Sequence, residues 1–282
     1  MTTIPEPHRT RAQAIADRFG DLPQVVAVTL AGSLVSGLTD DHSDLDMYVY
    51  HRDPIPADTR RAMAHEFAGE NDPSIEIDKP FWGPEDAWTD RASGLGVDLI
   101  YWSPDWITDQ VDRVLVRHEA WLGYTTSFWY TVQQSVALVD REDWFAGLQA
   151  RAHQPYPDAL RDAIVRLNYP VLRQIGSSYY HQIELAIQRR DRVSLNHRIT
   201  ALLASYFDIV FAVNHVPNPG EKRVLRQAER VCTTLPEHMA QDVDALLISS
   251  GAPWAESSTL AILDHLLKNL DTLLDIQTTS HI

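Results

Sequence analysis

The segment Asp44–Tyr50, DLDMYVY, strongly constrains how this chain can fold. Its polar or aromatic side chains alternate with aliphatic ones, as in a β-strand whose successive side chains point to opposite faces. Asp44 and Asp46 therefore share one face, where their charges repel each other and where burying either charge alone is costly. A divalent cation bound between the two carboxylates would relieve both costs.

Residues 1–118 alternate strand-like segments with helix-like ones. The run VVAVTLA, apolar almost throughout and rich in valine, is typical of a buried strand. The predicted strands are Val25–Ala31, Asp44–Tyr50, Ser74–Asp78 and Gly96–Trp102. Helices are expected over Leu34–Gly37, over Ala57–Glu70 and from Pro104 onward, and a loop with Pro, Gly and Trp is expected before Gly96.

From Glu119 onward the pattern is almost wholly helical. Pro170 is expected to kink or split one helix, and Gly176-Ser177-Ser178 would loosen the same helix further. The predicted helices are Leu122–Ala137, Glu142–Ala152, Ala159–Arg190, Leu195–Asn214, Glu221–Thr233, Pro236–Ser249 and Ala255–Gln277. This order predicts an α+β fold, with a small mixed-sheet domain over residues 1–118 and an all-α helical-bundle domain over residues 119–282.

A third acid is expected to join Asp44 and Asp46 at the cation. Asp98 is the only charged residue of its predicted strand, and it would complete the cluster if the two strands are neighbours. Glu76 or Asp78, on the preceding predicted strand, could take this place instead. Because Mg²⁺ prefers oxygen ligands and often takes one or two carboxylates together with substrate phosphates, these residues predict a magnesium site.

Gly32 and Ser33 follow the first predicted strand, with ten residues between Ser33 and Asp44. The backbone N–H groups at a helix start bind anions, and glycine lets a phosphate approach the backbone closely. The Ser33 hydroxyl adds a donor. The combination of strand, Gly-Ser and acidic strand predicts a triphosphate at one end of the motif and its metal ions at the other.

At these residues the chain resembles the nucleotidyltransferase superfamily with a DNA polymerase β-like core. The motif reads Ala31-Gly32-Ser33 followed by Asp44-Leu45-Asp46, and the resemblance covers roughly Val25 to Trp102. The helical half makes the chain look like the kanamycin- and streptomycin-type aminoglycoside nucleotidyltransferases. A second segment, Phe207–Gln227, is similar to one found in uncharacterised members with helical C-terminal domains.

The resemblance implies transfer of a nucleoside monophosphate from a nucleoside triphosphate, such as ATP, to a hydroxyl of a small molecule. It implies that Asp44 and Asp46 bind magnesium and that Gly32 and Ser33 contact the nucleotide phosphates. It also implies that Asp98 assists the metal or acts as a base. Aminoglycoside specificity does not carry over, because the chain has no clear motif for it.

Two residues of the helical half are further candidates. Lys222 follows Pro219-Gly220 at an expected helix start, so it is either a triphosphate contact or an ordinary surface lysine. Asp208 interrupts an apolar helix face, so it either holds a substrate amine or pairs with an arginine such as Arg198. The sequence leaves both choices open.

The net charge of −15 disfavours non-specific binding of nucleic acid and is compatible with metal ions or with a cationic small molecule. The lone cysteine, Cys232, excludes a disulfide framework and is in keeping with a cytoplasmic location. We expect no membrane-spanning segment, because the most apolar stretch is too short. The oligomeric state is not predicted.

Two other functions compete with nucleotidyl transfer to a small molecule. Arg192 and His197 lie on one expected helix, in a pattern that resembles helical ribonucleases of toxin–antitoxin pairs, whose nucleotidyltransferase partners act on RNA or protein. The other alternative is a nucleotide-binding module without catalysis, although such a module has less need of paired metal acids. The histidines form no short zinc-ligand pair.

Overall fold

The computed structural model describes residues 4–37, 43–79, 84–254 and 258–279, with side chains up to residue 275. The chain forms two compact units, each of which contains two segments of sequence. The first unit is Met1–Asp112 with Phe128–Gln154, and the second is Arg113–Ser127 with Pro155–Ile282. The predicted α+β class is confirmed, while the domain limits 1–118 and 119–282 stay a prediction.

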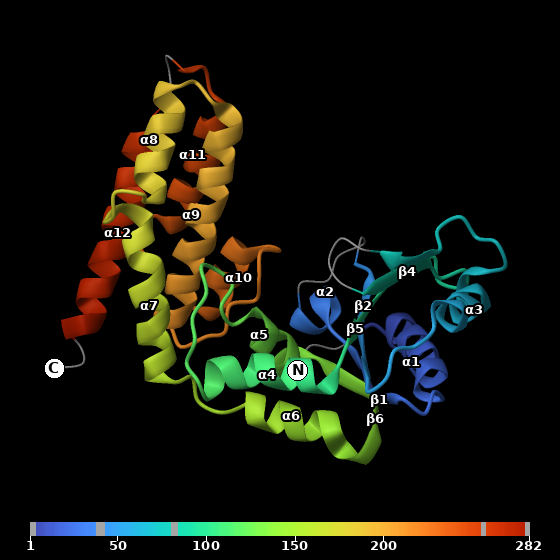
Figure 1. Cartoon of the computed structure of the whole chain (residues 1–282). Helices are drawn as coiled ribbons and strands as arrows, with labels where there is room; N and C mark the ends of the chain where they lie inside the picture. Colours follow the sequence, from blue (N-terminus) through green and yellow to red (C-terminus); the bar gives the residue numbers. More distant parts are fainter. Residues whose placement is uncertain (1–3, 38–42, 80–83, 255–257, 280–282) are drawn as a thin grey trace. The chain divides into compact units, whose positions relative to one another are not determined.

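A six-stranded mixed sheet forms the centre of the first unit (Figure 1). The strands are β1 (Val25–Leu30), β2 (Leu45–His51), β3 (Glu76–Lys79), β4 (Glu85–Thr89), β5 (Gly96–Trp102) and β6 (Val136–Asp140). Their order across the sheet is β3-β4-β5-β2-β1-β6. The neighbours β2 and β5 are parallel, whereas the other neighbouring strands are antiparallel.

One face of the sheet carries the hydrophobic core of this unit. Met47 of β2 and Leu99 of β5 are fully buried in one cluster with Ile15 and Met63. Ile15 belongs to α1 (Glu6–Gly20) and Met63 to α3 (Ala57–Ala68). The remaining helices of the unit are α2 (Gly32–Ser36), α4 (Pro104–Leu115), α5 (Ser127–Gln134) and α6 (Trp144–Ala152). Because strand side chains alternate, Asp46 and Asp98 lie on the face opposite to this core.

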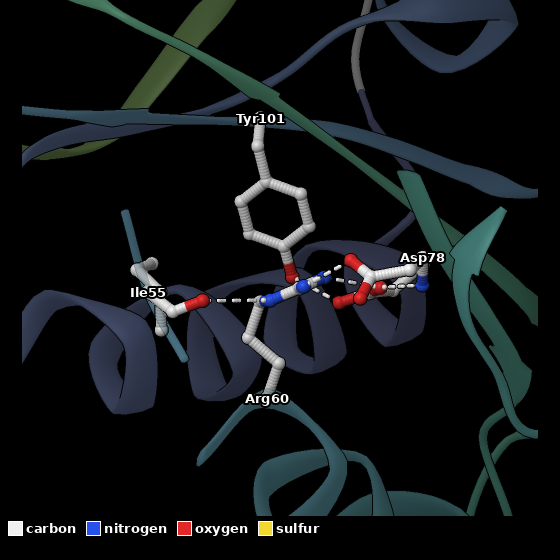
Figure 2. Close-up of polar contacts among 5 residues, drawn as sticks. Ile55, Arg60, Asp78 and Tyr101 are labelled. Carbon is white, nitrogen blue, oxygen red and sulfur yellow. Dashed lines mark hydrogen bonds and ion pairs between the residues drawn. The ribbon is translucent and has the colours of Figure 1, made fainter. Parts of the chain in front are cut away.

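A buried ion network fastens α3 to the sheet on the core side. Arg60 is 7% exposed and forms ion pairs with Asp86 and Asp78, and it also donates to the Ile55 carbonyl. Asp86, fully buried, accepts a further hydrogen bond of 2.7 Å from the Tyr101 hydroxyl. Figure 2 shows the Arg60 guanidinium between the Ile55 carbonyl and the Asp78 carboxylate. The network therefore ties α3, β3, β4 and β5 together.

Two strands depart from the sequence-based expectations. β4 lies where a loop is predicted; residues 80–83 of that loop lie outside the described part of the chain. β6 shows that the predicted helix over Leu122–Ala137 is wrong at both ends, because the helix α5 covers only Ser127–Gln134. Val136–Asp140 instead pairs with β1 and completes the sheet. The all-helical pattern expected after Glu119 is therefore interrupted by one strand.

The second unit is a helical bundle (Figure 1). Its helices are α7 (Asp158–Arg173), α8 (Tyr179–Gln188), α9 (Arg192–Val213), α10 (Val224–Val231), α11 (Met239–Gly251) and α12 (Thr259–Thr279). The predicted long helix is split as expected, but Pro170 stays inside α7. The break covers residues 174–178 and so includes Gly176-Ser177-Ser178, and Ser178 caps α8. Among the described helices, none is long and apolar enough to cross a membrane.

We expect Asp86→Asn to lower the free energy of unfolding by about 3 kcal/mol or more, because it leaves the buried Arg60 without its buried counter-ion. The matched change Asp78→Asn removes a carboxylate whose side chain is 59% exposed, so it should cost less than about 1 kcal/mol. Urea unfolding of both variants measures the difference. Equal losses would show that burial does not set the strength of this network.

Candidate active site

The register of β2 and β5 places two of the predicted acids side by side. Asp46 pairs with Asp98 across the parallel ladder, and Leu45 and Met47 pair with the residues on either side of Asp98. Paired residues of neighbouring strands point to the same face and lie about 4.8 Å apart along the hydrogen-bonding direction. The predicted neighbourhood of the two strands is thus observed, and Asp46 and Asp98 face the same side.

The Gly-Ser corner lies directly against the acidic strand. Gly32 has φ +68°, and a Cβ added there would lie 2.7 Å from Cγ of Asp46. A hydrogen bond of 2.8 Å from the Ala31 N–H to the Asp46 carbonyl fixes the same approach. α2 begins at Gly32 rather than at the predicted Leu34, so Gly32 and Ser33 form its first turn. Only a residue without a side chain fits this contact.

A second glycine makes room for Asp44. A Cβ added at Gly96, the first residue of β5, would lie 2.8 Å from Cγ of Asp44. Asp44 therefore reaches across from the start of β2 to the start of β5, on the face that carries Asp46 and Asp98. Sequence reasoning did not single out Gly96, because its role depends on the register of the two strands.

The three carboxylates fit a hard divalent cation in donor type. They lie on one face, with Asp44 exposed, Asp46 half-buried and the Asp98 side chain 34% exposed. Oxygen ligands are those that Mg²⁺ prefers. Across the described ranges, however, no three His, Cys, Asp or Glu side chains already converge in a metal-binding group.

A lysine, Lys79, lies among the acids of this face. Its ammonium lies 2.8 Å from a carboxylate oxygen of Glu85, 3.5 Å from Oδ1 of Asp98 and 3.9 Å from Oε2 of Glu76. Burial lowers the pKa of Lys79, but hydrogen bonding to Glu85 and the charge of Asp98 outweigh that effect, so its pKa is raised. Asp98 is thus turned toward a protein cation. No pattern in the sequence predicts this contact.

The two alternative third acids occupy different places. Asp78 has a left-handed backbone, φ 59°, and its carboxylate pairs with Arg60 on the core side, away from Asp98. Glu76 and Asp98 are both paired with Ala87 of β4, so Glu76 lies in the same row as Asp98 but two strands away. Of the three candidates, Asp98 is the neighbour of Asp46.

Aromatic side chains cover the far end of the same face. The rings of Tyr48 and Trp102 pack at a tilt with centroids 4.2 Å apart, and Trp102 contacts Trp106 and Phe128 with ring centroids 5.2 and 5.5 Å away. Burial raises the pKa of Tyr48, and the charge of the nearby Asp46 adds to this effect. The acids therefore lie toward the starts of β2 and β5 on this face, and the aromatic side chains lie toward the ends of the same strands.

In the second unit, Asp208 has a structural environment. It is 1% exposed and accepts hydrogen bonds from the Thr125 hydroxyl at 2.6 Å, the Thr125 N–H at 3.1 Å and the Asn218 amide at 3.1 Å. Arg198 is not among these partners, but the charge of another arginine, Arg113, acts on the Asp208 carboxylate. Contact of Asp208 with a substrate amine stays a prediction. Burial raises its pKa to about 6, although the bonds from Thr125 and Asn218 oppose the rise.

Lys222 and the ribonuclease-like pair also lie in the second unit. Lys222 is exposed in the turn before α10, and its contact with a triphosphate stays a prediction. Arg192 donates to the carbonyls of Ser250 and Ala252 at 2.7 and 2.6 Å, whereas His197 is exposed on α9. The Arg192 guanidinium is thus used to join the start of α9 to the end of α11.

Solved structures similar to this chain include a nucleotidyltransferase-like protein from Exiguobacterium sibiricum 255-15, 14% identical over 95% of this chain and 75% of that one, with a TM-score of 0.43. The spectinomycin adenyltransferase AAD(9) from Enterococcus faecialis, solved with ATP and spectinomycin, is 11% identical over 95% and 100%, with a TM-score of 0.33. The CCA-adding enzyme of Thermotoga maritima is 10% identical over 98% and 83%, with a TM-score of 0.32.

No protein-family model and no curated protein sequence matches the chain. The three similar structures are 10–14% identical to this chain, with TM-scores from 0.32 to 0.43. At this level of identity, a function has to be argued from the side chains of the site.

We expect Gly32→Ala to destabilise the first unit more than Gly94→Ala does. Both glycines have positive φ, 68° and 73°, so both variants carry about 1 kcal/mol of left-handed strain. An added Cβ meets nothing within 4 Å at Gly94, but it meets the Asp46 carboxylate at Gly32, which should add about 1–3 kcal/mol. Urea unfolding measures both losses, and equal losses would contradict the close contact.

The raised pKa of Asp208 predicts a pH-dependent stability. Its pKa in the folded chain, about 6, exceeds the ordinary value of 3.8, so the stability that the protonated Asp208 contributes is present below the lower pKa and is lost as the pH rises through the higher one. Relative to Asp208→Asn, the free energy of unfolding of the native chain should fall by about 2 kcal/mol between about pH 4.5 and about pH 7.5. Asp244→Asn, at an exposed position of α11, is the control. A difference that stays constant with pH would contradict the assignment.

Proposed function

We propose that this protein is a metal-dependent nucleotidyltransferase that moves a nucleoside monophosphate from a nucleoside triphosphate to a hydroxyl of a small molecule. The observation that carries the proposal is the arrangement of Gly32 against Asp46, with Asp98 paired beside Asp46 on one sheet face. The Gly-Ser corner, which we propose binds phosphate, is thus in contact with the row of carboxylates. A purely structural role would not need two aspartates and a neighbouring third on a solvent-accessible strand face.

The roles of the residues follow from this placement. Asp44, Asp46 and Asp98 are the residues that would hold Mg²⁺, which when bound neutralises the phosphate charge. Gly32 and Ser33 would receive the phosphates at the start of α2, because the backbone can be approached closely there.

In the reaction, the acceptor hydroxyl forms a bond to the α-phosphorus while the bond from that phosphorus to the bridging oxygen breaks. Asp98 takes the hydroxyl proton, and pyrophosphate leaves with the electron pair of the broken bond. Asp98 is suited to this part because its side chain is 34% exposed beside Asp46.

The partners follow from charge and composition. ATP is the proposed donor, and a triphosphate contact by Lys222 is part of the proposal. The net charge of −15 favours a cationic acceptor, such as an aminoglycoside-like molecule, over nucleic acid. A cytoplasmic location is proposed, since the chain has a single cysteine and no disulfide.

The test is transfer of label from α-³²P-ATP to a panel of hydroxyl-bearing acceptors. We expect the native chain to label at least one acceptor and Asp46→Asn to lose roughly 10²–10³-fold of the rate, the scale on which one electrostatic contact to a transition state acts. Asp58→Asn is the matched control, because it makes the same chemical change at an exposed position of α3. It should keep the native rate.

The competing functions give different results in the same assay. Normal transfer by Asp46→Asn would show that the proposed mechanism is wrong. Magnesium-dependent nucleotide binding without transfer to any acceptor would favour the binding module. RNA degradation without added nucleotide would favour the ribonuclease, provided that Arg192→Ala abolishes it. The Arg192→Ala variant has to stay folded for this result to count.

A further inference from the structure

Lys79 holds a position that the proposed reaction does not use. It is the last residue of the short strand β3, and its side chain is 24% exposed. Its partner across the sheet is Glu85, which pairs in turn with Ile100 of β5. This row lies next to the row of Asp98 on the acidic face. The ammonium therefore reaches along the face, from the row of Glu85 toward that of Asp98.

Lys79 makes a close ion pair with a buried acid, called the brace here, and a longer ion pair with a more exposed acid, called the target. Glu85 is the brace, because its side chain is only 10% exposed and its oxygen lies 2.8 Å from the ammonium. Asp98 is the target, at 3.5 Å and with a side chain 34% exposed. The ion pair with Glu85 fixes the position of the ammonium. The longer contact with Asp98 is therefore made by a lysine that is held in place, and not by a mobile surface lysine.

The opposing charges at this site are unequal. The face brings together Asp44, Asp46, Asp98, Glu85 and Glu76, and Lys79 forms ion pairs with the last three of these acids. An acidic cluster of this kind is self-repelling, and one internal cation reduces that repulsion. The same cation repels any metal ion that approaches Asp98.

We propose that Lys79 is a positioning residue that occupies the cation position at Asp98, so that a divalent cation must displace its ammonium before Asp98 joins Asp44 and Asp46. The inference rests on the proposed function for the identity of the metal acids. It adds a competition between a lysine and a metal for one carboxylate. Displacement leaves the ammonium on Glu85, where its charge stays compensated.

The test measures binding of Mn²⁺ alone, without nucleotide, by the loss of the free-ion signal in electron paramagnetic resonance. Lys79→Met keeps the length of the side chain and removes the charge, so we expect Mn²⁺ to bind roughly tenfold more tightly. Lys79→Arg keeps the charge and should bind Mn²⁺ as the native chain does. Lys268→Met, which removes a charge from an exposed position of α12, controls for net charge and should change nothing.

A double-mutant cycle with Asp98→Asn separates competition from a general electrostatic effect. If Lys79 competes for the Asp98 carboxylate, most of the gain from Lys79→Met should vanish when Asp98 is Asn. An equal gain in both backgrounds would overturn the competition. An unchanged or weaker affinity in Lys79→Met would overturn it as well, with Lys79→Gln as a second variant and circular dichroism to verify folding.

Asp46→Asn distinguishes the failure of this inference from the failure of the proposed function. If Asp46→Asn abolishes Mn²⁺ binding but Lys79→Met leaves it unchanged, the metal site stands and the role of Lys79 is wrong. If neither substitution changes Mn²⁺ binding, both proposals are wrong. If Lys79→Met binds Mn²⁺ more tightly and the double variant with Asp46→Asn loses this binding, the proposed function and the role of Lys79 are both supported.

Discussion

The parallel pairing of β2 with β5 is the constraint on which the site depends. It sets Asp46 beside Asp98, and it places the start of β5 where Gly96 admits the Asp44 carboxylate. Every other strand pair in the sheet is antiparallel, so this one pair brings the starts of two strands, and with them the acids, to the same end of the sheet. A slip of β5 by one residue would turn the Asp98 side chain toward the core.

The two faces of the sheet differ in how their charged side chains are paired. On the core side, Arg60 and Asp86 are buried together, and each polar atom finds a partner among neighbouring side chains or backbone. On the acidic side, carboxylates outnumber the lysine between them and keep part of their surface in water. The first arrangement fixes α3 and the outer strands, whereas the second is where we propose that a cation binds.

The sequence predicts elements best where a single property dominates. β1, β2, β5 and α3 were predicted within two residues at each end, because their apolar runs or stripes admit one interpretation. β4, EDAWT, carries two acids that are buried by Arg60 and Lys79, and those partners come from elsewhere in the chain. β6, VALVD, is as compatible with a helix as with a strand until β1 supplies its partner. Among the site residues, Asp44, Asp46 and Asp98 are visible as acids in apolar segments, while Gly96 and Lys79 depend on strand register.

The late position of β6 in the chain has a consequence for synthesis on the ribosome. β1 is buried along its whole length, yet its outer neighbour is made only after the excursion of Arg113–Ser127 into the second unit. Until Asp140 has emerged, the nascent sheet ends in an apolar strand with open backbone groups, a template for pairing with other chains. A nascent chain that pauses near residue 118 would therefore be most in need of a chaperone, and a shortened gene ending there would encode an aggregating product.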